Sequence, residues 1–230
     1  MFTPHSPKLQ FPDLHQNVSH GQRVYTVPGH GTYESMTTFL ARMTPPSPGL
    51  EEWKARVGEK EATARMKRGA ARGTVVHLLL EEYLQGTSGR SAGVMPIHMD
   101  LFTQIKKEVA KCLSTIYVLE GAMYSHKYRL AGRADLIGIW NGQLSVIDFK
   151  TATSHQYPDA LHKHYLQAAG YARLFESMTA WPYAHPAVTQ LVILSASEAN
   201  PHCEIFAVPS SPPLAAFEAM WAKDQLQQKA

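Results

Sequence analysis

The chain has 230 residues, of which 44% are hydrophobic and 18% are charged, and these fractions are typical of a soluble globular protein. Its two cysteines are too few for a disulfide framework or a zinc knuckle, no apolar run approaches the roughly 18 residues of a membrane span, and the N-terminus lacks the apolar core of a signal peptide. We therefore expect a cytoplasmic protein without a membrane anchor, and the net charge of +3 allows nucleic acid as a partner without requiring it.

The predicted elements begin after a polar arm, residues 1–30, which contains four prolines and is expected to be irregular. Helices are predicted over 33–43, 50–84 (one helix, or two with a break at Gly73), 99–113, 162–178 and 213–228. Strands are predicted over 115–124, 128–140, 143–150, 188–195 and 203–208. This order predicts a mixed α/β (α+β) fold with a central mixed sheet of about four to five strands flanked by helices. Residues 31–230 then form one domain, with a helical part over 31–113 and the sheet core over 114–230.

A β-hairpin is the clearest local feature of the chain. Asn141-Gly142 joins two β-prone runs, and this dipeptide favours a type I′ turn because that turn needs a positive φ at both central residues. Counting outward from the turn places Asp135 opposite Asp148, with Lys150 two residues further on the same strand face. Opposed carboxylates repel each other unless a cation lies nearby, and paired carboxylates are also how proteins hold Mg²⁺. The hairpin therefore predicts a metal-dependent catalytic site.

The alternative for these residues is a surface hairpin that carries an Asp–Lys pair. Apolar residues on both faces of the hairpin near its turn argue against this alternative, because they indicate a sheet that is covered on both sides. Charges at the end of such a hairpin lie where a cleft can form.

His77 lies in an apolar stretch, residues 75–80, on a helix that is expected to be largely buried. Glu81 follows one turn later on the same helix face. The simpler interpretation is a core histidine whose hydrogen bond is satisfied by Glu81. The alternative is an imidazole metal ligand. The spacing of these two residues alone does not decide between the two interpretations.

Gln167 and Tyr171 are one turn apart on the helix that follows the hairpin. The tyrosine is expected either to pack in the core beside a solvated glutamine, or to hold a nucleotide together with it. The helical region from Trp53 to Arg72 carries seven basic and two acidic residues, a local net charge of +5. It is either a solvated helix face or a track for a phosphate backbone, and the second interpretation selects three DNA-binding residues: Arg65, Lys67 and Arg68.

Four motifs occur in a specific order along the chain. They are Gly73-x-x-x-His77-x-x-x-Glu81, Gly132-Arg133-Ala134-Asp135, Asp148-Phe149-Lys150-Thr151 and Gln167-x-x-x-Tyr171. Together they resemble the PD-(D/E)XK nuclease superfamily and, within it, the RecB-type branch with the proteins that are similar to the mitochondrial genome maintenance exonuclease in phages and bacteria. The resemblance extends over roughly residues 24–225, and Ala134 stands where the superfamily name has proline.

The resemblance implies a restriction-endonuclease-like core in which residues 31–230 form one nuclease domain. It implies a DNA exonuclease that uses Mg²⁺ or Mn²⁺ and acts on single-stranded DNA or DNA ends, in replication, repair or recombination, in a bacterial or phage-infected cell. The implied metal ligands are His77, Asp135, Asp148 and the backbone carbonyl of Phe149, with Glu120 as an outer ligand. Asp135, Asp148 and Lys150 are the implied catalytic residues, and Gln167 and Tyr171 position the strand.

Physical chemistry supports these roles independently. A phosphodiester is anionic and resists attack, so a cation must offset its charge and lower the pKa of a bound water. An ammonium such as that of Lys150 adds to the field without competing for the metal.

Two alternatives are retained. The first is a non-catalytic nucleic-acid-binding or recombination partner protein that keeps the nuclease fold, and the intact set of Asp135, Asp148, Lys150 and His77 argues against it. The second is a sequence-specific endonuclease, for which the chain offers no appended specificity domain. Cleavage polarity, a replication or recombination partner protein and the oligomeric state are left open.

Overall fold

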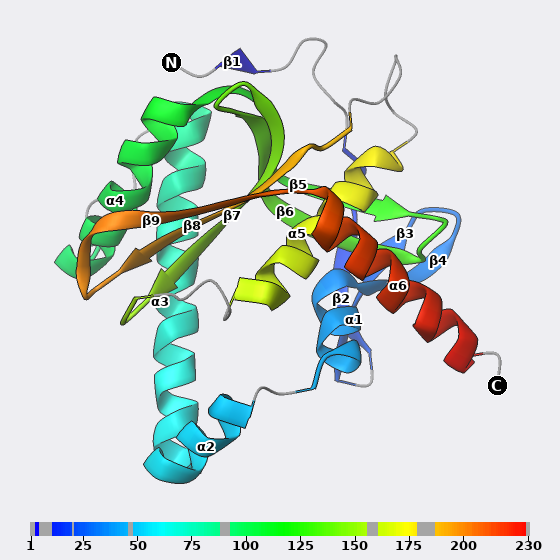
Figure 1. The fold of residues 1–230 in the computed structure, drawn as a ribbon, viewed down its shortest axis with the longest axis horizontal. Helices are drawn as coiled ribbons and strands as arrows, with labels where there is room; N and C mark the ends of the chain where they lie inside the picture. The colour runs from blue at the N-terminus through cyan, green and yellow to red at the C-terminus, as the bar shows by residue number, and fades with distance from the viewer. Residues whose placement is uncertain are drawn as a thin grey trace.

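The computed structural model describes residues 3–4, 11–19, 21–45, 48–87, 93–155, 161–178 and 187–228 (Figure 1). The helices are α1 (Met36–Met43), α2 (Pro48–Val57), α3 (Glu59–Gln85), α4 (Pro96–Cys112), α5 (His162–Glu176) and α6 (Ser211–Gln228). The strands are β1 (Thr3–Pro4), β2 (His15–Ser19), β3 (Gln22–Val27), β4 (Gly31–Ser35), β5 (Leu113–Ser125), β6 (Leu130–Trp140), β7 (Gln143–Ala152), β8 (Gln190–Ser197) and β9 (Asn200–Pro209). None of the described helices is long and apolar enough to cross a membrane.

Nine of the described strands join one mixed sheet. Its main path runs β2-β3-β4-β6-β7-β8-β9, and β5 pairs with both β6 and β1. The pairs β4–β6 and β7–β8 are parallel, and β5–β6, β6–β7 and β8–β9 are antiparallel. The predicted mixed sheet flanked by helices is therefore confirmed, but it has more strands than the four to five that were expected.

The additional strands come mostly from the N-terminal segment. The prediction of an irregular arm is wrong for residues 15–19 and 22–27, which form the antiparallel strands β2 and β3. Likewise, β4 lies inside the part that was expected to be helical. Tyr25, Val27 and Tyr33 alternate with less buried residues and bury their side chains in a small core that they share with Ala122 and Ala131. Pro28 lies in the turn between β3 and β4 and interrupts neither strand, so its presence did not argue against strands here.

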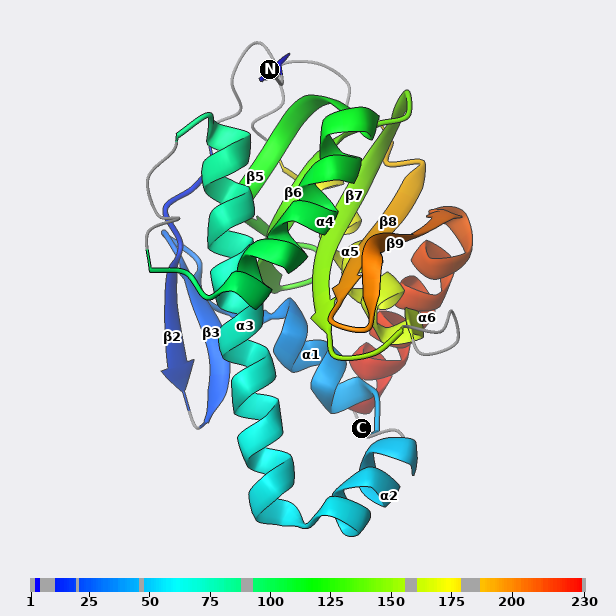
Figure 2. The same cartoon turned by 90° about the vertical axis from the view of Figure 1, so that its left-hand side faces the viewer.

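Helices cover both faces of the sheet (Figure 2). Helices α3 and α4 pack on one face, where Val76 and Ile105 meet Ile147. Helices α1, α5 and α6 pack on the other face, where Phe39 and Phe217 belong to the same core as Val146. The neighbours Val146 and Ile147 thus point into opposite cores, as expected for the sheet covered on both sides that the hairpin predicted.

The helix α3 returns the chain from the projecting α2 to the sheet (Figure 1). It is continuous through Gly73, so the predicted break there is wrong, and the break lies instead at Gly58, whose φ is +84°. The buried apolar residues of α3 lie mainly in its second half, from Val76 to Leu84. The first half therefore has little core to pack against, and together with α2 it projects beyond the sheet (Figure 1).

Candidate active site

The sheet opens along β6 at the position of the predicted catalytic hairpin. One edge of β6 is occupied by β5 along its length, so β4 and β7 must share the other edge. There β4 pairs with residues 130–131, and β7 pairs with residues 136–140. Residues 132–135 of β6 therefore lie between these two neighbours and belong to neither ladder. This interval is the opening of the sheet. Asp135 stands at the end of this interval, and its Oδ2 accepts a hydrogen bond from the backbone N–H of Phe149 at 2.8 Å.

The predicted hairpin register is confirmed over the paired residues. Trp140 pairs with Gln143, and the ladder continues in step to Leu136 and Ile147. Both turn residues have a positive φ, +48° for Asn141 and +81° for Gly142, as a type I′ turn requires. Asp135 and Asp148 are the next positions outward from the last pair, so they lie side by side at the mouth of the opening.

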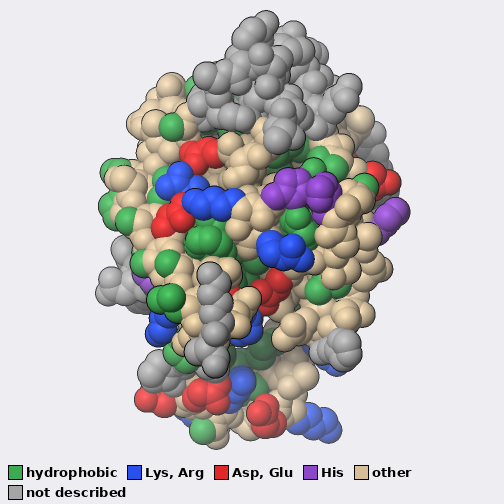
Figure 3. All heavy atoms as spheres, turned by 90° about the vertical axis from the view of Figure 1, so that its right-hand side faces the viewer, with side chains coloured by type: hydrophobic (Ala, Val, Ile, Leu, Met, Phe, Trp, Pro, Cys, Tyr) green, Lys and Arg blue, Asp and Glu red, His purple; other side chains and the backbone are tan. Residues whose placement is uncertain are grey.

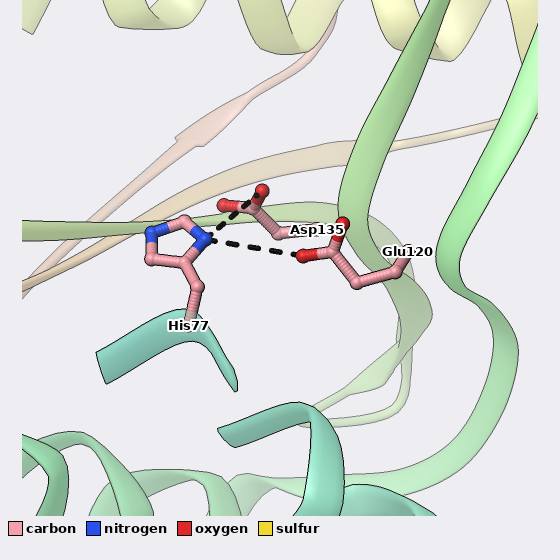
Figure 4. Close-up of side chains that lie close together, drawn as sticks. All are labelled: His77, Glu120 and Asp135. Carbon is pink, nitrogen blue, oxygen red and sulfur yellow. Dashed lines mark ion pairs between the residues drawn. The ribbon is translucent and has the colours of Figure 1, made fainter. Parts of the chain in front are cut away.

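A histidine and two carboxylates meet at this opening (Figure 4). His77 comes from α3, Glu120 from β5 and Asp135 from β6, and their nearest ligand atoms all lie within 4.8 Å of one another. The Nδ1 of His77 is 3.4 Å from Oδ1 of Asp135 and 3.9 Å from Oε1 of Glu120. One nitrogen and two carboxylate donors in this arrangement form a group that can hold a divalent cation.

The other ring nitrogen of His77 is also engaged. Its Nε2–H donates to the backbone carbonyl of Phe149 at 2.9 Å. The interpretation in which Glu81 satisfies His77 is wrong, because Glu81 instead accepts a hydrogen bond from Gln85 at 3.0 Å. Glu81 lies one turn further along α3 than His77. The two residues share a helix face, but this did not make Glu81 the hydrogen-bond partner of His77.

Asp148 and Lys150 form a buried ion pair beside this cluster. Nζ of Lys150 contacts Oδ2 of Asp148, whose residue is 3% exposed. Burial raises the pKa of Asp148 to about 6, although Lys150 opposes the effect and Asp135 adds to it. For Lys150, burial acts to lower the pKa, but Asp148 and Asp135 outweigh it and the pKa of the ammonium is raised. The pKa values of Asp148 and Lys150 thus depend on their mutual contact and on Asp135.

The cluster and the ion pair are electrostatically linked. Burial disfavours the charged form of His77, but Asp135 and Glu120 outweigh it and raise the pKa of the imidazole to about 10. Burial likewise acts to raise the pKa of Asp135, but the charges of His77 and Lys150 outweigh it and lower that pKa. Without a metal, the proton on His77 therefore supplies the positive charge that the carboxylates require.

Gln167 and Tyr171 lie on α5, which packs on the face of the sheet opposite α3. Nε2 of Gln167 donates to Oη of Tyr171 at 3.3 Å, and Tyr171 is only 5% exposed. Burial raises the pKa of the Tyr171 phenol. A Cβ on Gly132 would lie 2.7 Å from Cε1 of Tyr171, so the tyrosine ring requires glycine at that position. Tyr171 thus packs in the core as one interpretation expected, while a contact between DNA and Gln167 stays a prediction.

The basic residues of α3 divide between two sides of the helix. Arg65 and Arg68 line a groove of about 920 Å³ with Trp53 and Arg72, between the start of α3 and the start of α4. Lys67 lies elsewhere, in a hollow lined also by Glu59, Lys60, Thr63 and Ala64. The structure therefore brings Arg65 and Arg68 together but separates Lys67 from them. Glu61 pairs with Arg65 at 2.7 Å and with Arg68 at 3.2 Å, so part of the positive charge is already offset.

The surface drawn in Figure 3 is recessed between its lowest part, where α2 and the start of α3 lie, and the body of the protein. On the same face, acidic and basic side chains are interspersed, and no single sign of charge dominates. This face therefore carries no uniformly basic surface.

Glu120 is the site residue that the sequence indicated least. It was expected only as an outer ligand, yet its carboxylate lies in the cluster with His77 and Asp135. The turn between β5 and β6 carries no signal as definite as Asn-Gly, and β5 has a register irregularity between Ile116 and Val118. Counting along the chain could therefore not place Glu120 opposite Asp135.

Comparisons with known proteins point to a nuclease family. The family model described as the PD-(D/E)XK nuclease superfamily matches residues 86–228, which include the hairpin and α5. Similar solved structures include SSO0001, which is 17% identical with a TM-score of 0.39 and is matched over 84% of this chain and 74% of that chain. Another is a proposed exonuclease from Eubacterium rectale, 12% identical with a TM-score of 0.43, matched over 68% of this chain and 65% of that chain. No curated protein matches significantly.

The family match covers more than half of the chain and ends near its last helix, whereas His77 and α3 precede the matched region. The matched region contains both aspartates and the lysine of the hairpin, and the fold is a mixed sheet with helices on both faces. The chain belongs to the PD-(D/E)XK nuclease superfamily.

Proposed function

We propose that this nuclease is a DNA exonuclease that depends on Mg²⁺ or Mn²⁺ and acts on single-stranded DNA or DNA ends in replication, repair or recombination. The observation that carries the proposal is the cluster of His77, Glu120 and Asp135 directly beside the buried Asp148–Lys150 pair. A protein that only bound nucleic acid would have no need to keep buried carboxylates next to one another, because such a group lowers the stability of the fold unless a cation offsets it.

The donor set fits the proposed cation. Carboxylate oxygens suit Mg²⁺ and Mn²⁺, and an imidazole nitrogen is compatible with Mn²⁺. His77, Asp135, Asp148 and the carbonyl of Phe149 are the ligands that the family resemblance implies, and all four residues lie around the opening of the sheet. When bound there, the cation would offset the charge of the phosphodiester and lower the pKa of the attacking water.

Lys150 acts through its charge in this proposal. Its ammonium is held by Asp148, which also keeps it protonated because the pKa of Lys150 is raised. A fixed ammonium next to the scissile phosphate stabilises the negative charge that develops in the transition state, without any cost of reorganising the site. Asp148 therefore contributes by positioning Lys150 as well as by its own negative charge.

The path of the strand is proposed from the groove beside the projecting helices. Arg65 and Arg68, with Arg72, line the groove on one side and can contact phosphates, and Trp53 offers a ring on which a base can stack. The preference for a free end, and therefore for an exonuclease over an endonuclease, comes from the family resemblance.

Cleavage of end-labelled DNA tests this function. Linear single-stranded, duplex and circular single-stranded DNA of equal length are each incubated with Mg²⁺, Mn²⁺ or EDTA. We expect linear single strands to be degraded to short products with either metal, and circular DNA to remain intact. Cleavage in EDTA would contradict the metal requirement. Circular DNA cut as fast as linear DNA would identify an endonuclease, and binding without cleavage under all conditions would identify a non-catalytic protein.

A further inference from the structure

An exposed arginine lies close to Asp135 on the same strand. Along β6, Ala131, Arg133 and Asp135 are alternate residues, so their side chains share one face of the sheet. The residues between them point to the opposite face, where Ala134 belongs to the core that α5 covers. Arg133 is therefore on the face that carries the cluster, and the two residues that separate it from Asp135 span about 7 Å of strand.

Two further arginines lie on this face. Ala131 shares a small core with Tyr25 of β3 and Tyr33 of β4, so both strands continue the face that carries the cluster. Arg23 is two residues before Tyr25 on β3 and points to the same side. The guanidinium of Arg129 lies 5.1 Å from the centroid of the Tyr33 ring, which places it on this face as well. We call Arg23, Arg129 and Arg133 the arginine patch.

The positive charge of the arginine patch is not offset by carboxylates. All three side chains are exposed, and none of them forms an ion pair with another residue that the structure describes. Most other arginines of the described chain do form such pairs, namely Arg42, Arg65, Arg68, Arg72 and Arg173. A planar guanidinium matches the geometry of phosphate oxygens and can donate two hydrogen bonds to them. The patch therefore has the charge and the chemistry to bind phosphates.

The arginine patch adjoins the cluster electrostatically. Burial raises the pKa of Tyr25, Arg23 and Arg133 oppose that effect, and Glu120 adds to it. The same buried phenol is thus close to two arginines and to one carboxylate of the cluster. The structure nevertheless shows no ion pair between a described arginine and Glu120 or Asp135, so the guanidiniums stay available to a ligand that reaches the cluster.

The arginine patch and the groove lie on opposite sides of the opening. Strands β6 and β7 part at Asp135 and Asp148, directly after their last ladder pair. The groove adjoins the β7 branch, because Thr153 lines it just past the end of β7. The patch belongs to the β6 branch and to the strands beyond it, β4 and β3. A DNA strand that crosses the opening would therefore meet basic side chains on both sides.

We propose that the arginine patch binds backbone phosphates of a single DNA strand next to the scissile phosphodiester, with Arg133 on the phosphate nearest the cluster. This inference rests on the proposed function and extends it by assigning a second stretch of the strand to β3 and β6. The family match begins at residue 86, so Arg23 and β3 lie outside the matched region. Phosphate contacts carry no sequence information, and the patch should bind strands of any sequence.

Fluorescence anisotropy of a labelled single-stranded oligonucleotide tests the inference in EDTA, where cleavage is not expected. The wild type is compared with the triple variant Arg23→Gln, Arg129→Gln, Arg133→Gln. The matched control is Arg56→Gln on α2, which also removes an exposed arginine without an ion pair to a described residue.

The expected effects follow from counterion release. Each phosphate contact of a single strand contributes about 0.7 to the slope of log affinity against log salt concentration, so losing three contacts should reduce the slope by about 2. The affinity of the triple variant should fall by about tenfold or more, because hydrogen bonds to charged groups contribute on that scale. With Mg²⁺, its KM should rise more than its kcat falls, since the contacts lie beyond the reacting phosphate. Arg56→Gln should change none of these quantities.

Neutral phosphates locate the contact on the DNA. A methylphosphonate is placed at one position at a time along the oligonucleotide. At the positions that meet the patch, it should weaken binding to the wild type but not to the triple variant, because the partner charge is already absent there. Equal losses for both proteins at every position would contradict the inference.

The remaining outcomes separate the inference from the proposed function. If the triple variant keeps the affinity, salt slope and KM of the wild type, or if Arg56→Gln matches its losses, the inference is overturned, and the function stands when the wild type cleaves linear single strands with Mg²⁺. A wild type that neither binds nor cleaves them overturns both. Exposed side chains without ion pairs contribute little to stability, so the triple variant should unfold near the wild-type temperature. A large drop would indicate a structural role and overturn the inference.

Discussion

Replacing Asp148 with asparagine is predicted to stabilise the metal-free protein while it removes nuclease activity. Asp148 is 3% exposed, and burial raises its pKa from an ordinary value of 3.8 to about 6, in spite of the attraction of Lys150. This difference is about two pKa units, and each unit corresponds to about 1.4 kcal/mol. The ionised carboxylate therefore lowers the free energy of unfolding by about 3 kcal/mol, and a neutral asparagine amide in its place removes most of that loss.

The effect depends on pH in a definite direction. Below about pH 3, Asp148 is mostly protonated in both the folded and the unfolded protein, so its ionisation hardly affects stability. Above about pH 6 it is ionised in both states, and the full loss applies. The advantage of Asp148→Asn should thus grow from near zero at about pH 3 to about 3 kcal/mol at pH 7. It should be measured in EDTA, because a bound cation would stabilise the ionised wild type.

Urea unfolding across this pH range checks the prediction. Asp135→Asn is the matched control, because the pKa of Asp135 is lowered in the folded protein and its ionised form stabilises the fold. This neighbouring variant should lose stability at pH 7, opposite in sign to Asp148→Asn. An Asp148→Asn protein that is no more stable than the wild type at pH 7, or whose advantage does not change with pH, would refute the reasoning. With Mn²⁺ present, its cleavage rate should fall by about 100-fold or more.

Three other predictions follow from the site and its supports. Lys150→Ala should lower the cleavage rate by about 100-fold or more while the circular dichroism spectrum stays that of the wild type, and near-normal turnover would contradict its role. In a binding titration, neutralising Arg65 and Arg68 together should weaken DNA binding and reduce its salt dependence, whereas Lys67→Gln, on the other side of α3, should change neither quantity. If Lys67→Gln weakened binding as much as the loss of both arginines, the groove would not be the DNA-binding surface. Gly132→Ala should lower the free energy of unfolding by about 1–3 kcal/mol in urea, because its Cβ would overlap a buried tyrosine ring, and an unchanged value would contradict that packing.

The hairpin could be predicted in detail because its information is local. Asn141-Gly142 selects the turn, the turn fixes the register, and the register places Asp135 beside Asp148. Each step involves residues only a few positions apart, so no knowledge of the rest of the fold was needed. The same argument explains why the apolar residues on the two hairpin faces were assigned correctly to opposite cores.

Features that depend on distant residues could not be predicted in this way. Residues 22–27 form a strand because they pair with β4 and bury Tyr25 and Val27 in one core with residues of β5 and β6, and residues 15–19 pair with this strand in turn. A proline-containing polar segment gives no sign of such partners. The contact of His77 with the Phe149 carbonyl joins positions 72 residues apart, so the sequence offered Glu81 as the nearer candidate. Gly73 did not end α3, since a glycine inside a long helix lowers its stability only modestly.

The most direct test of the account is a crystal structure of the protein soaked in Mn²⁺, in which anomalous scattering locates the ion. The account predicts a Mn²⁺ ion at the opening of the sheet, within about 2.0–2.6 Å of a carboxylate oxygen of Asp135 and a ring nitrogen of His77. An ion bound elsewhere, or one held by Asp135 and Asp148 with the His77 ring more than about 4 Å away, would contradict it.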